Sequence, residues 1–176
     1  MNIVIQKRWD GHLIPEQEWV RLSLKRHRSG LQILVDAPFY GDPKPVLEPG
    51  PTPGLWEYEV VELFVLHDGA ADSPRYTEVE LGPHGHHLVL CLDGVRQVVS
   101  QLHPLQYSVQ SAAGETRRWR GVALVPHALL PPPPWRCNAT AIHGVDSARA
   151  FLSWTPLPGD GPDFHRLAGW PLLELS

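Results

Sequence analysis

The stretch that decides the fold is Leu55–Leu92, LWEYEVVELFVLHDGAADSPRYTEVELGPHGHHLVLCL. Three segments of this stretch read as strands, because they alternate or cluster apolar and β-branched residues between turn residues. These strand-like segments carry five glutamates, which are Glu57, Glu59, Glu62, Glu78 and Glu80. Glutamate has a poor strand propensity, and a buried carboxylate is costly without a partner. The stretch therefore predicts either a solvated sheet face or a site for a cation or a polyol.

Alternation with a period of two assigns these glutamates to faces. Glu62 shares one face with the apolar Val60 and Phe64, whereas the two earlier glutamates fall on the other face. If this segment forms a hairpin with the next, Glu62 faces Glu78 or Glu80. Like charges directly opposite one another are destabilising, so we expect an intervening cation, an Arg or His, or a shared proton. A structural Glu62, hydrogen-bonded to Tyr, Trp or backbone groups, is an equally open alternative.

The rest of the chain is cut into short elements by scattered proline (19 residues) and glycine (15 residues). Helical signal is confined to single turns at His127–Leu130 and Ser147–Phe151. This organisation predicts an all-β fold, a single antiparallel β-sandwich domain over residues 1–176 with little helix. The expected strands are Trp19–Lys25, Leu31–Ala37, Tyr58–Leu66, Tyr76–Leu81, His87–Leu92, Val95–Gln101, Leu105–Gln110, Trp119–Val125 and Arg136–Ile142.

Composition bounds the functions of the chain. The formal net charge of −4 and the isoelectric point near 6.2 argue against a general nucleic-acid binder. No stretch is long and apolar enough to span a bilayer, and the first residues lack the pattern of a secretory signal. Two cysteines, Cys91 and Cys137, are too few for a disulfide framework. We expect a cytoplasmic protein with no nucleic-acid or membrane partner, and we expect a bacterial source; the oligomeric state stays open.

Two long proline-containing loops, Pro38–Gly54 and Thr155–Gly169, are candidates for carrying function. A flat indole beside carboxylates is a common way to bind a sugar, because the C–H groups of the sugar lie on the ring. Of the seven tryptophans, Trp56 and Trp154 adjoin these loops, and we expect both near a pocket. Most of the other tryptophans are expected to pack in the core.

Acids and histidines offer two kinds of cation site. A hard cation such as calcium takes several carboxylate and carbonyl oxygens, although no EF-hand spacing is present. A transition metal would use histidines, but the His-x-His at His84 and His86 lacks the glutamate that follows in a cupin. The cofactor therefore stays unknown, with calcium as the named option. The candidate metal ligands are Glu62, Glu80, Asp163 and His165.

Nucleophilic catalysis finds no support, because the sequence has no G-x-S-x-G elbow and no cysteine in a catalytic context. Paired carboxylates serve glycoside hydrolysis in many enzymes. A hydrolase usually offers a deeper cleft than one small sandwich, so an enzyme is the alternative rather than the main interpretation.

Six motifs run in order along nearly the whole chain: WDG at Trp9–Gly11, APFYGDP at Ala37–Pro43, LWEYEVVELF at Leu55–Phe64, EVELGPHGHHLVL at Glu78–Leu90, AIHG at Ala141–Gly144 and PDFHRL at Pro162–Leu167. Together they resemble uncharacterised protein family 0462, a resemblance that brings no known activity. More distantly, the pattern Trp-x-x-x-x-x-Glu-x-Phe, then Glu-x-x-Pro-x-Gly, then a late Phe-His is similar to family-nine carbohydrate-binding modules and DOMON-like domains. That similarity implies a jelly-roll-like β-sandwich, with sugar sites and structural calcium in some members.

The main hypothesis is a non-catalytic domain that binds a carbohydrate or another small polar ligand, with a structural cation as an option. One alternative is a small enzyme, acting on glycosides or using a metal, built on the Glu and His residues. The other alternative is a protein-interaction domain with no small-molecule site. The expected ligand-binding residues are Trp56, Glu62, Glu78, Glu80, His84, His143, Trp154 and His165.

Overall fold

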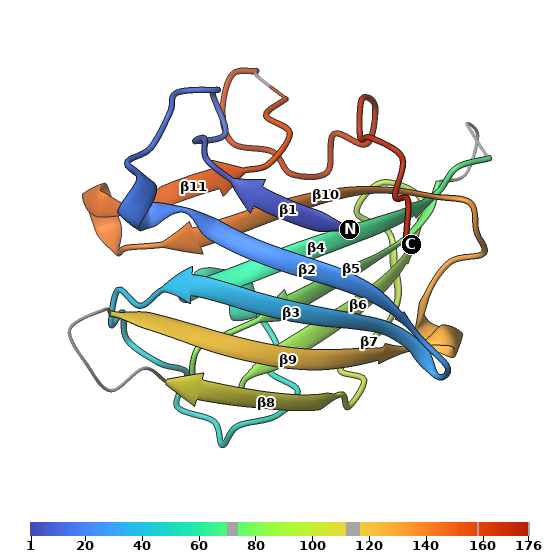
Figure 1. The fold of residues 1–176 in the computed structure, drawn as a ribbon, viewed down its shortest axis with the longest axis horizontal. Helices are drawn as coiled ribbons and strands as arrows, with labels where there is room; N and C mark the ends of the chain where they lie inside the picture. Colours follow the sequence, from blue (N-terminus) through green and yellow to red (C-terminus); the bar gives the residue numbers. More distant parts are fainter. Residues whose placement is uncertain (70–73, 112–116, 158, 176) are drawn as a thin grey trace.

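Two antiparallel sheets make up the fold of the computed structural model, which describes residues 1–69, 74–111, 117–157 and 159–175. The five-stranded sheet has the order β1-β2-β3-β9-β8, and the six-stranded sheet has the order β11-β10-β4-β5-β6-β7 (Figure 1). The first sheet consists of β1 (Asn2–Ile5), β2 (Val20–His27), β3 (Gly30–Pro38), β9 (Arg118–Pro126) and β8 (Gln106–Ser111). The second consists of β11 (Ala150–Ser153), β10 (Trp135–His143), β4 (Val60–His67), β5 (Arg75–Leu81), β6 (His87–Asp93) and β7 (Val98–Gln101).

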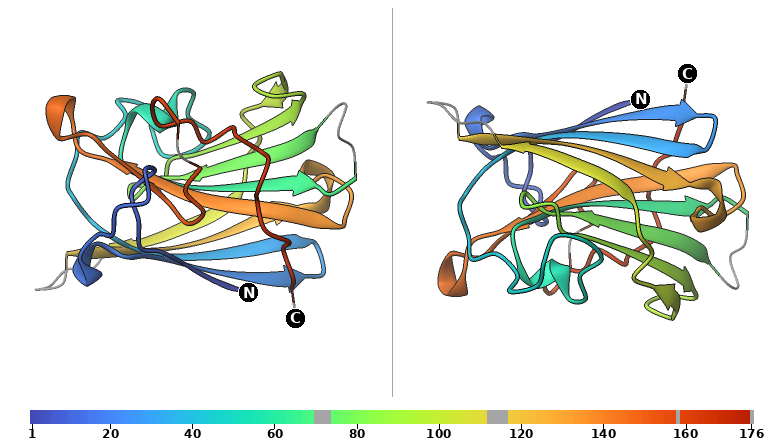
Figure 2. Two further views of the ribbon diagram at one scale, coloured as in Figure 1. Left: turned by 90° about the horizontal axis from the view of Figure 1, so that it is seen from above. Right: turned by 90° about the horizontal axis from the view of Figure 1, so that it is seen from below.

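The two sheets pack face to face as the layers of a sandwich, which Figure 2 shows edge-on. Alternation along each strand sends every second side chain into the space between the sheets. On β4 these inward residues are Val61, Leu63 and Val65, and on β3 they are Leu31, Ile33 and Val35. All six are almost completely buried. The single antiparallel β-sandwich that we expected is therefore confirmed.

A second apolar layer covers part of the outer face of the six-stranded sheet. Phe64 and Tyr76 project outward from β4 and β5, and the fully buried Trp170 packs on both, with ring centroids 5.5 Å and 6.2 Å away. Trp170 belongs to the C-terminal segment, which runs along β10: the Cys137 N–H donates to the Pro171 carbonyl. Most sandwich sheets leave this face to water, so the covering segment creates the depth that a site on this face needs.

Helical structure is limited, among the residues described, to four 3₁₀ turns: η1 (Glu16–Glu18), η2 (Leu55–Glu57), η3 (His127–Leu129) and η4 (Asp146–Ala148). None of these is long and apolar enough to cross a membrane. The expected turn at His127–Leu130 is therefore present. At Ser147–Phe151 the expectation was wrong in part, because the turn ends at Ala148 and β11 begins at Ala150.

All nine expected strands are present, with shifted ends. The largest shift is at Val95–Gln101, where a turn at Gly94–Gln97 delays the strand to Val98. Residues 95–101 alternate as a strand would, so the sequence does not reveal this turn. In the turn Arg96 adopts a positive φ of 59°, which few side chains prefer. The short edge strands β1 and β11 were not among the nine, since four residues carry little periodic signal.

A buried carboxylate holds the first residues of the Pro-rich loop after β3. Glu59 is buried, and its side chain accepts hydrogen bonds from the backbone N–H groups of Tyr40, Gly41 and Asp42 at 3.0–3.4 Å. Three successive amides around one anion form a compact anion-binding turn. Glu59 is thus a structural anchor, and its loop reaches the open end of β4 where η2 begins.

Candidate functional site

A cavity of about 400 Å³ opens on the outer face of the six-stranded sheet. Its floor comes from β4, β5 and β6, and its rim comes from η2, the turn before β7, β11 and the C-terminal segment. The lining residues are Trp56, Glu62, Phe64, Glu78, Leu90, Leu92, Arg96, Val98, Ile142, Phe151, Pro162, Phe164 and His165. An apolar wall with a few convergent polar groups is the usual composition of a small-ligand site.

Three glutamates form the polar part of the floor. The β4–β5 register places Glu62 directly opposite Glu80 and places Glu78 opposite Phe64, so the three acids share the outer face. Their exposed fractions are 2% for Glu62, 4% for Glu78 and 0% for Glu80. One carboxylate oxygen from each lies within 4.8 Å of the others. The predicted hairpin is therefore present, and two of its glutamates lie directly opposite one another.

The three carboxylates receive little hydrogen bonding from the rest of the protein. The Thr140 hydroxyl on β10 donates a short hydrogen bond to Oε2 of Glu62. Neither oxygen of Glu80 accepts a hydrogen bond of normal geometry from the part of the chain that the structure describes, and the same holds for Oε2 of Glu78. Buried polar atoms are nearly always paired in native proteins. Such a concentration of unpaired acceptors marks this floor as unusual.

Burial and mutual repulsion make ionisation of this cluster unfavourable. Burial raises the pKa of Glu62 to about 7, although the Thr140 hydroxyl and the charge of Arg149 act to lower it. Burial and the charge of Glu62 hold the pKa of Glu78 well above its usual range. Burial and both neighbours do the same for the pKa of Glu80, against the opposite effect of the Trp56 backbone N–H. For all three carboxylates to be ionised at neutral pH, a positively charged partner is required here.

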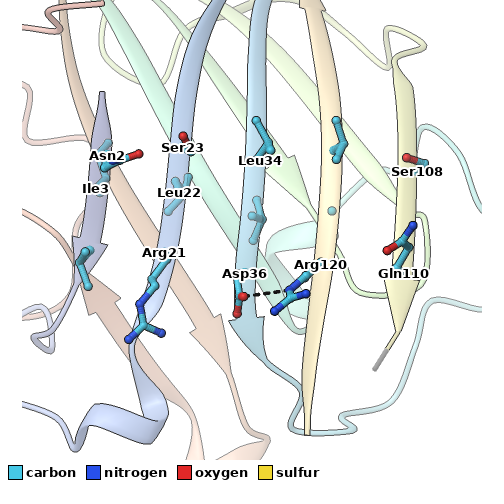
Figure 3. A pocket seen from close by; sticks show the side chains of 14 residues that line it. Asn2, Ile3, Arg21, Leu22, Ser23, Leu34, Asp36, Ser108, Gln110 and Arg120 are labelled. Carbon is cyan, nitrogen blue, oxygen red and sulfur yellow. Dashed lines mark hydrogen bonds and ion pairs between the residues drawn. The ribbon is translucent and has the colours of Figure 1, made fainter. Parts of the chain in front are cut away.

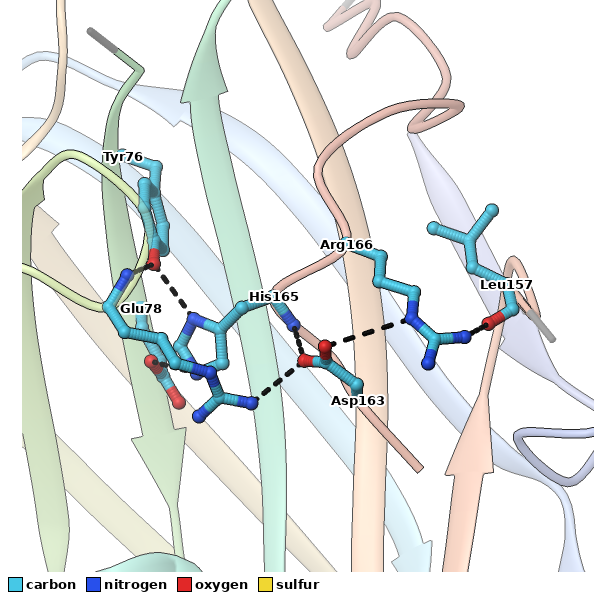
Figure 4. A network of polar contacts seen from close by, with 7 residues as sticks. Tyr76, Glu78, Leu157, Asp163, His165 and Arg166 are labelled. Atoms are coloured by element: carbon cyan, nitrogen blue, oxygen red, sulfur yellow. Dashed lines mark hydrogen bonds and ion pairs between the residues drawn. The ribbon is translucent and has the colours of Figure 1, made fainter. Parts of the chain in front are cut away.

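A chain of polar contacts runs along one side of the cavity to Glu78 (Figure 4). The Arg96 backbone N–H donates to the Tyr76 hydroxyl at 2.9 Å, and that hydroxyl lies 2.8 Å from Nδ1 of His165. In the tautomer with its proton on Nε2, the Tyr76 hydroxyl donates to Nδ1 while it accepts the Arg96 N–H. Nε2 lies 3.7 Å from Oε2 of Glu78.

His165 is neutral at physiological pH in this environment. Burial and the charge of Arg96 lower the pKa of His165 to about 4, and Asp163 only partly opposes this. The Arg96 guanidinium is engaged by Asp163, with Nη2 donating to Oδ1 at 2.8 Å. Asp163 also accepts the His165 backbone N–H at 3.0 Å, as Figure 4 shows. His165 is therefore a positioned polar group near Glu78, with Nε2 3.7 Å from Oε2 of Glu78.

Trp56 forms the opposite rim of the cavity, and Arg149 holds it there. The indole is 43% exposed, which is unusual for the largest apolar side chain. The Arg149 guanidinium donates from Nη2 to the Trp56 carbonyl and from Nη1 to the Glu57 carbonyl, the latter at 3.0 Å. Two carbonyls of η2 are thus fixed by one side chain from the turn before β11. The ring is presented to solvent on a constrained backbone.

The structure brings together four of the expected ligand-binding residues, since Trp56, Glu62, Glu78 and His165 line one cavity. A fifth, Glu80, lies against Glu62 and Glu78 beneath the floor. The metal candidate Asp163 lies on the rim, where it is engaged by Arg96 and by the Arg166 guanidinium, the latter at 3.7 Å.

The structure places the other three expected residues away from this cavity. His84 lies in the β5–β6 turn, with its ring edge-on to Phe39 at 5.6 Å. His143 ends β10 on the inner side of the sheet and stacks on Tyr40, with ring centroids 3.6 Å apart and planes 4° from parallel. Trp154 packs against the core between the sheets. The sequence around a histidine or a tryptophan next to a loop does not show which face of the sandwich that loop crosses.

Three residues near the site were not expected from the sequence. Arg96, Thr140 and Arg149 were passed over because an arginine in a turn and a threonine in a strand are ordinary. A pairing argument would have found Thr140, which lies directly opposite Glu62 on the neighbouring strand. The two arginines carry no local signal for the site, because the partners Asp163, Trp56 and Glu57 lie 67 and 92–93 residues away in sequence.

A larger cavity, about 550 Å³, lies on the outer face of the five-stranded sheet. Figure 3 shows its side chains spread in rows over β1, β2, β3, β9 and β8. Its charged groups are paired locally: Asp36 accepts hydrogen bonds from both Arg118 and Arg120. Its polar groups are spread along the strands rather than gathered on one point. The Glu-lined cavity is therefore the candidate site.

The fold and this cavity define the class of the protein as an antiparallel β-sandwich with a pocket on one sheet face. No family model matches the sequence. The UPF0462 protein C4orf33 of human is 41% identical over 175 residues, covering 95% of this chain and 84% of the relative. Its rat and zebrafish homologues are 41% and 38% identical over the same 95% of this chain, covering 84% and 85% of the relatives. The chain belongs to the UPF0462 family.

These relatives bear on two expectations. The resemblance to uncharacterised protein family 0462 is confirmed. The expectation of a bacterial protein is wrong, because the curated relatives come from vertebrates: human, rat, mouse and zebrafish.

A solved structure supports the fold independently. A presumed carbohydrate-binding protein from Bacteroides uniformis matches with a TM-score of 0.66, covering 100% of this chain and 86% of that chain. The two sequences are only 16% identical, so the likeness shows a shared sandwich fold and nothing about ligands.

Proposed function

We propose that this protein is a non-catalytic binding domain whose ligand is a carbohydrate or a similar polyol, held in the Glu-lined cavity. One observation carries the proposal: the half-exposed Trp56 ring stands beside the buried carboxylates of Glu62 and Glu78 in one cavity. An indole face accepts the C–H groups of a sugar ring, and carboxylates accept hydrogen bonds from its hydroxyls.

The size and polarity of the cavity support a small ligand. About 400 Å³ accommodates one or two sugar rings and lies within the range of ordinary ligand pockets. Arg96 and His165 add hydrogen-bond donors on the rim opposite Trp56. The fold shared with the presumed carbohydrate-binding protein from Bacteroides uniformis is consistent with this class of ligand.

The test is a glycan array followed by isothermal titration with the best hit. We expect Trp56→Ala to weaken binding by roughly 5- to 30-fold, because stacking on an exposed indole contributes on the order of 1–2 kcal/mol. Trp9→Ala is the matched control, since Trp9 is partly exposed but does not line this cavity. Binding that survives Trp56→Ala, or an array without a hit, would contradict the proposal and favour the protein-interaction alternative.

A second function is favoured by the Tyr76–His165–Glu78 chain, which is the kind of arrangement that transfers protons. Glu78 has a raised pKa, as a general acid needs, and an oxygen of Glu62 lies within 4.8 Å of an oxygen of Glu78. The enzyme would be a glycoside hydrolase. Aryl glycosides that release a coloured phenol test it: turnover that disappears in Glu78→Gln supports hydrolysis, and no turnover by the intact protein rejects it for those substrates.

A further inference from the structure

The floor of the cavity has the geometry of a cation site. Glu62, Glu78 and Glu80 project from two adjacent strands, and one oxygen from each lies within 4.8 Å of the others. Calcium binds oxygens at 2.3–2.6 Å, so two oxygens up to about 5 Å apart contact one ion. Strand backbones fix the three Cα positions, and the buried side chains have little freedom to separate. The cluster is therefore preorganised around one point.

Unsatisfied atoms point to the same conclusion independently of the clustering. Glu80 is completely buried, yet both of its oxygens lack a hydrogen bond of normal geometry within the described ranges. Oε2 of Glu78 is likewise unpartnered. An unpaired buried carboxylate costs several kcal/mol, and two of them beside a third are a large penalty for a fold to carry. A bound cation would remove that penalty.

The protein's own cations near the cluster are committed elsewhere. Arg96 directs its guanidinium at Asp163, 2.8 Å away. The Arg149 guanidinium donates hydrogen bonds to the carbonyls of Trp56, Glu57 and Gly144. His165 approaches Glu78 only to 3.7 Å. The charge of the cluster is thus not balanced by a side chain in direct contact.

We propose that Glu62, Glu78 and Glu80 together bind one divalent cation, and that calcium is the ion that their chemistry fits. The ligands are carboxylate oxygens, which hard cations prefer, and no cysteine or coordinating histidine joins them within the described ranges. Magnesium demands a stricter octahedron at 2.0–2.1 Å. Glu80 would be the innermost ligand, and the Thr140 hydroxyl would orient the Glu62 carboxylate as a supporting contact.

The ion would lie between the sheet and the cavity. Glu62 and Glu78 line the cavity, whereas Glu80 lies beneath it, so the open coordination positions would face the cavity. Three carboxylates supply three to six of the six to eight oxygens that calcium takes. Water, or two hydroxyls of a ligand, would supply the rest. The cation site does not depend on the ligand being a carbohydrate.

The primary test uses the full chain without a His tag, dialysed against chelator and then titrated with calcium chloride at pH 7.5. We expect about one calcium per chain by elemental analysis. We also expect Tm to rise by roughly 5–10 °C when free calcium exceeds the dissociation constant a hundredfold, because an ion that binds only the folded state stabilises it. No bound calcium together with an unchanged Tm at millimolar calcium would overturn the proposal.

Glu80→Gln is the decisive variant, since it removes one charge while keeping the side-chain shape. In chelator we expect its Tm to equal or exceed that of the unaltered protein, because a buried repulsion is relieved. In calcium we expect the rise in Tm to be lost. Glu57→Gln is the matched control: Glu57 is an exposed acid nearby, and its variant should keep the full rise. A calcium response that persists in Glu80→Gln would place the ion elsewhere.

Different results would reject the proposed sugar binding and the proposed cation site. Trp56→Ala should weaken sugar binding and leave the calcium-dependent rise in Tm intact. An array without a sugar hit, combined with a calcium response that Glu80→Gln removes, would reject the carbohydrate and uphold the cation. Another outcome is that Glu80→Gln has a higher Tm than the unaltered protein by the same amount in chelator and in calcium. In that case the three carboxyls share protons, and the cation proposal is wrong.

Discussion

Glu62 and Glu80 lie directly opposite one another on the adjacent strands β4 and β5, and both side chains are buried. Opposed like charges normally destabilise a sheet, even at its surface. Here Glu78 lies on the same face within reach of both. A fold that retains three such carboxylates gives up stability at this point, which is the usual signature of a functional site.

Thr140→Val tests how Glu62 is held. The hydroxyl donates to the Glu62 carboxylate in a buried environment, so its removal leaves that oxygen unpaired. We expect unfolding to become easier by about 1–3 kcal/mol at pH 7.5, measured by urea denaturation. The same substitution in a Glu62→Gln background provides the second half of a double-mutant cycle. Equal costs in both backgrounds would show that the hydroxyl does not act through the carboxylate.

Glu59→Ala should release the Pro-rich loop that precedes η2. The Glu59 carboxylate accepts three backbone N–H groups, which lose their only described side-chain partner together. We expect a loss of roughly 2–4 kcal/mol in the free energy of unfolding and faster proteolysis between residues 40 and 46. Glu57→Ala removes an exposed acid two residues earlier and should change stability by less than about 0.5 kcal/mol. Similar protease patterns for the two variants would contradict the anchoring role.

Arg149→Ala should weaken ligand binding without unfolding the protein. Arg149 is half-buried and donates hydrogen bonds to the carbonyls of Trp56 and Glu57 in η2. Its loss frees the backbone that presents the indole, so we expect about a tenfold weaker affinity for the sugar, which is about 1.4 kcal/mol. Titration calorimetry measures the affinity, and Tm controls for folding. Unchanged affinity would mean that η2 positions Trp56 unaided.

His143 predicts a loss of stability in mild acid. Burial and Arg8 lower the pKa of His143 to about 4, against the attraction of Asp42, whereas an unfolded histidine titrates near 6.5. Between pH 6.5 and 4 the unfolded state takes up a proton that the folded state does not, so stability falls as the pH falls. Below about pH 4 this contribution is constant.

The variant His143→Phe checks that dependence, because phenylalanine keeps the stack on Tyr40 and cannot titrate. We expect the free energy of unfolding of the variant to fall less steeply between pH 6.5 and 4. His165 has a pKa of about 4 as well, so part of the slope should remain. Identical slopes for the variant and the unaltered protein would show that His143 is not shielded from protons.

Strand positions and faces were predictable from the sequence, because both are local. Alternation placed Glu62 between Val60 and Phe64 on one face, and that face is the one that carries the cavity. The same argument paired Glu62 with a glutamate of the next strand, which is Glu80 in the observed register. It also set Glu59 apart from Glu62, although its role in holding the Tyr40–Asp42 turn was not visible.

Membership of the site was less predictable, because it depends on contacts between distant segments. His84, His143 and Trp154 have the residue types of a binding site, yet the turns and strand that carry them face other parts of the molecule. Arg96 and Arg149 reach the site from turns that have no pattern of their own. A period of two says which side chains share a face, but not what covers that face.

The sequence by itself determined that this protein is an antiparallel β-sandwich with glutamates where strands normally exclude them. Hydrophobic periodicity and turn residues suffice for this, because both depend only on residues close together in the sequence. Only the tertiary structure decided which glutamates meet and what surrounds them. The C-terminal segment, with Trp170 seated on Phe64 and Tyr76, covers one side of the outer sheet face, and η2 closes the other. Burial of Glu62, Glu78 and Glu80 follows from that covering, because a carboxylate on an open sheet face would simply be hydrated.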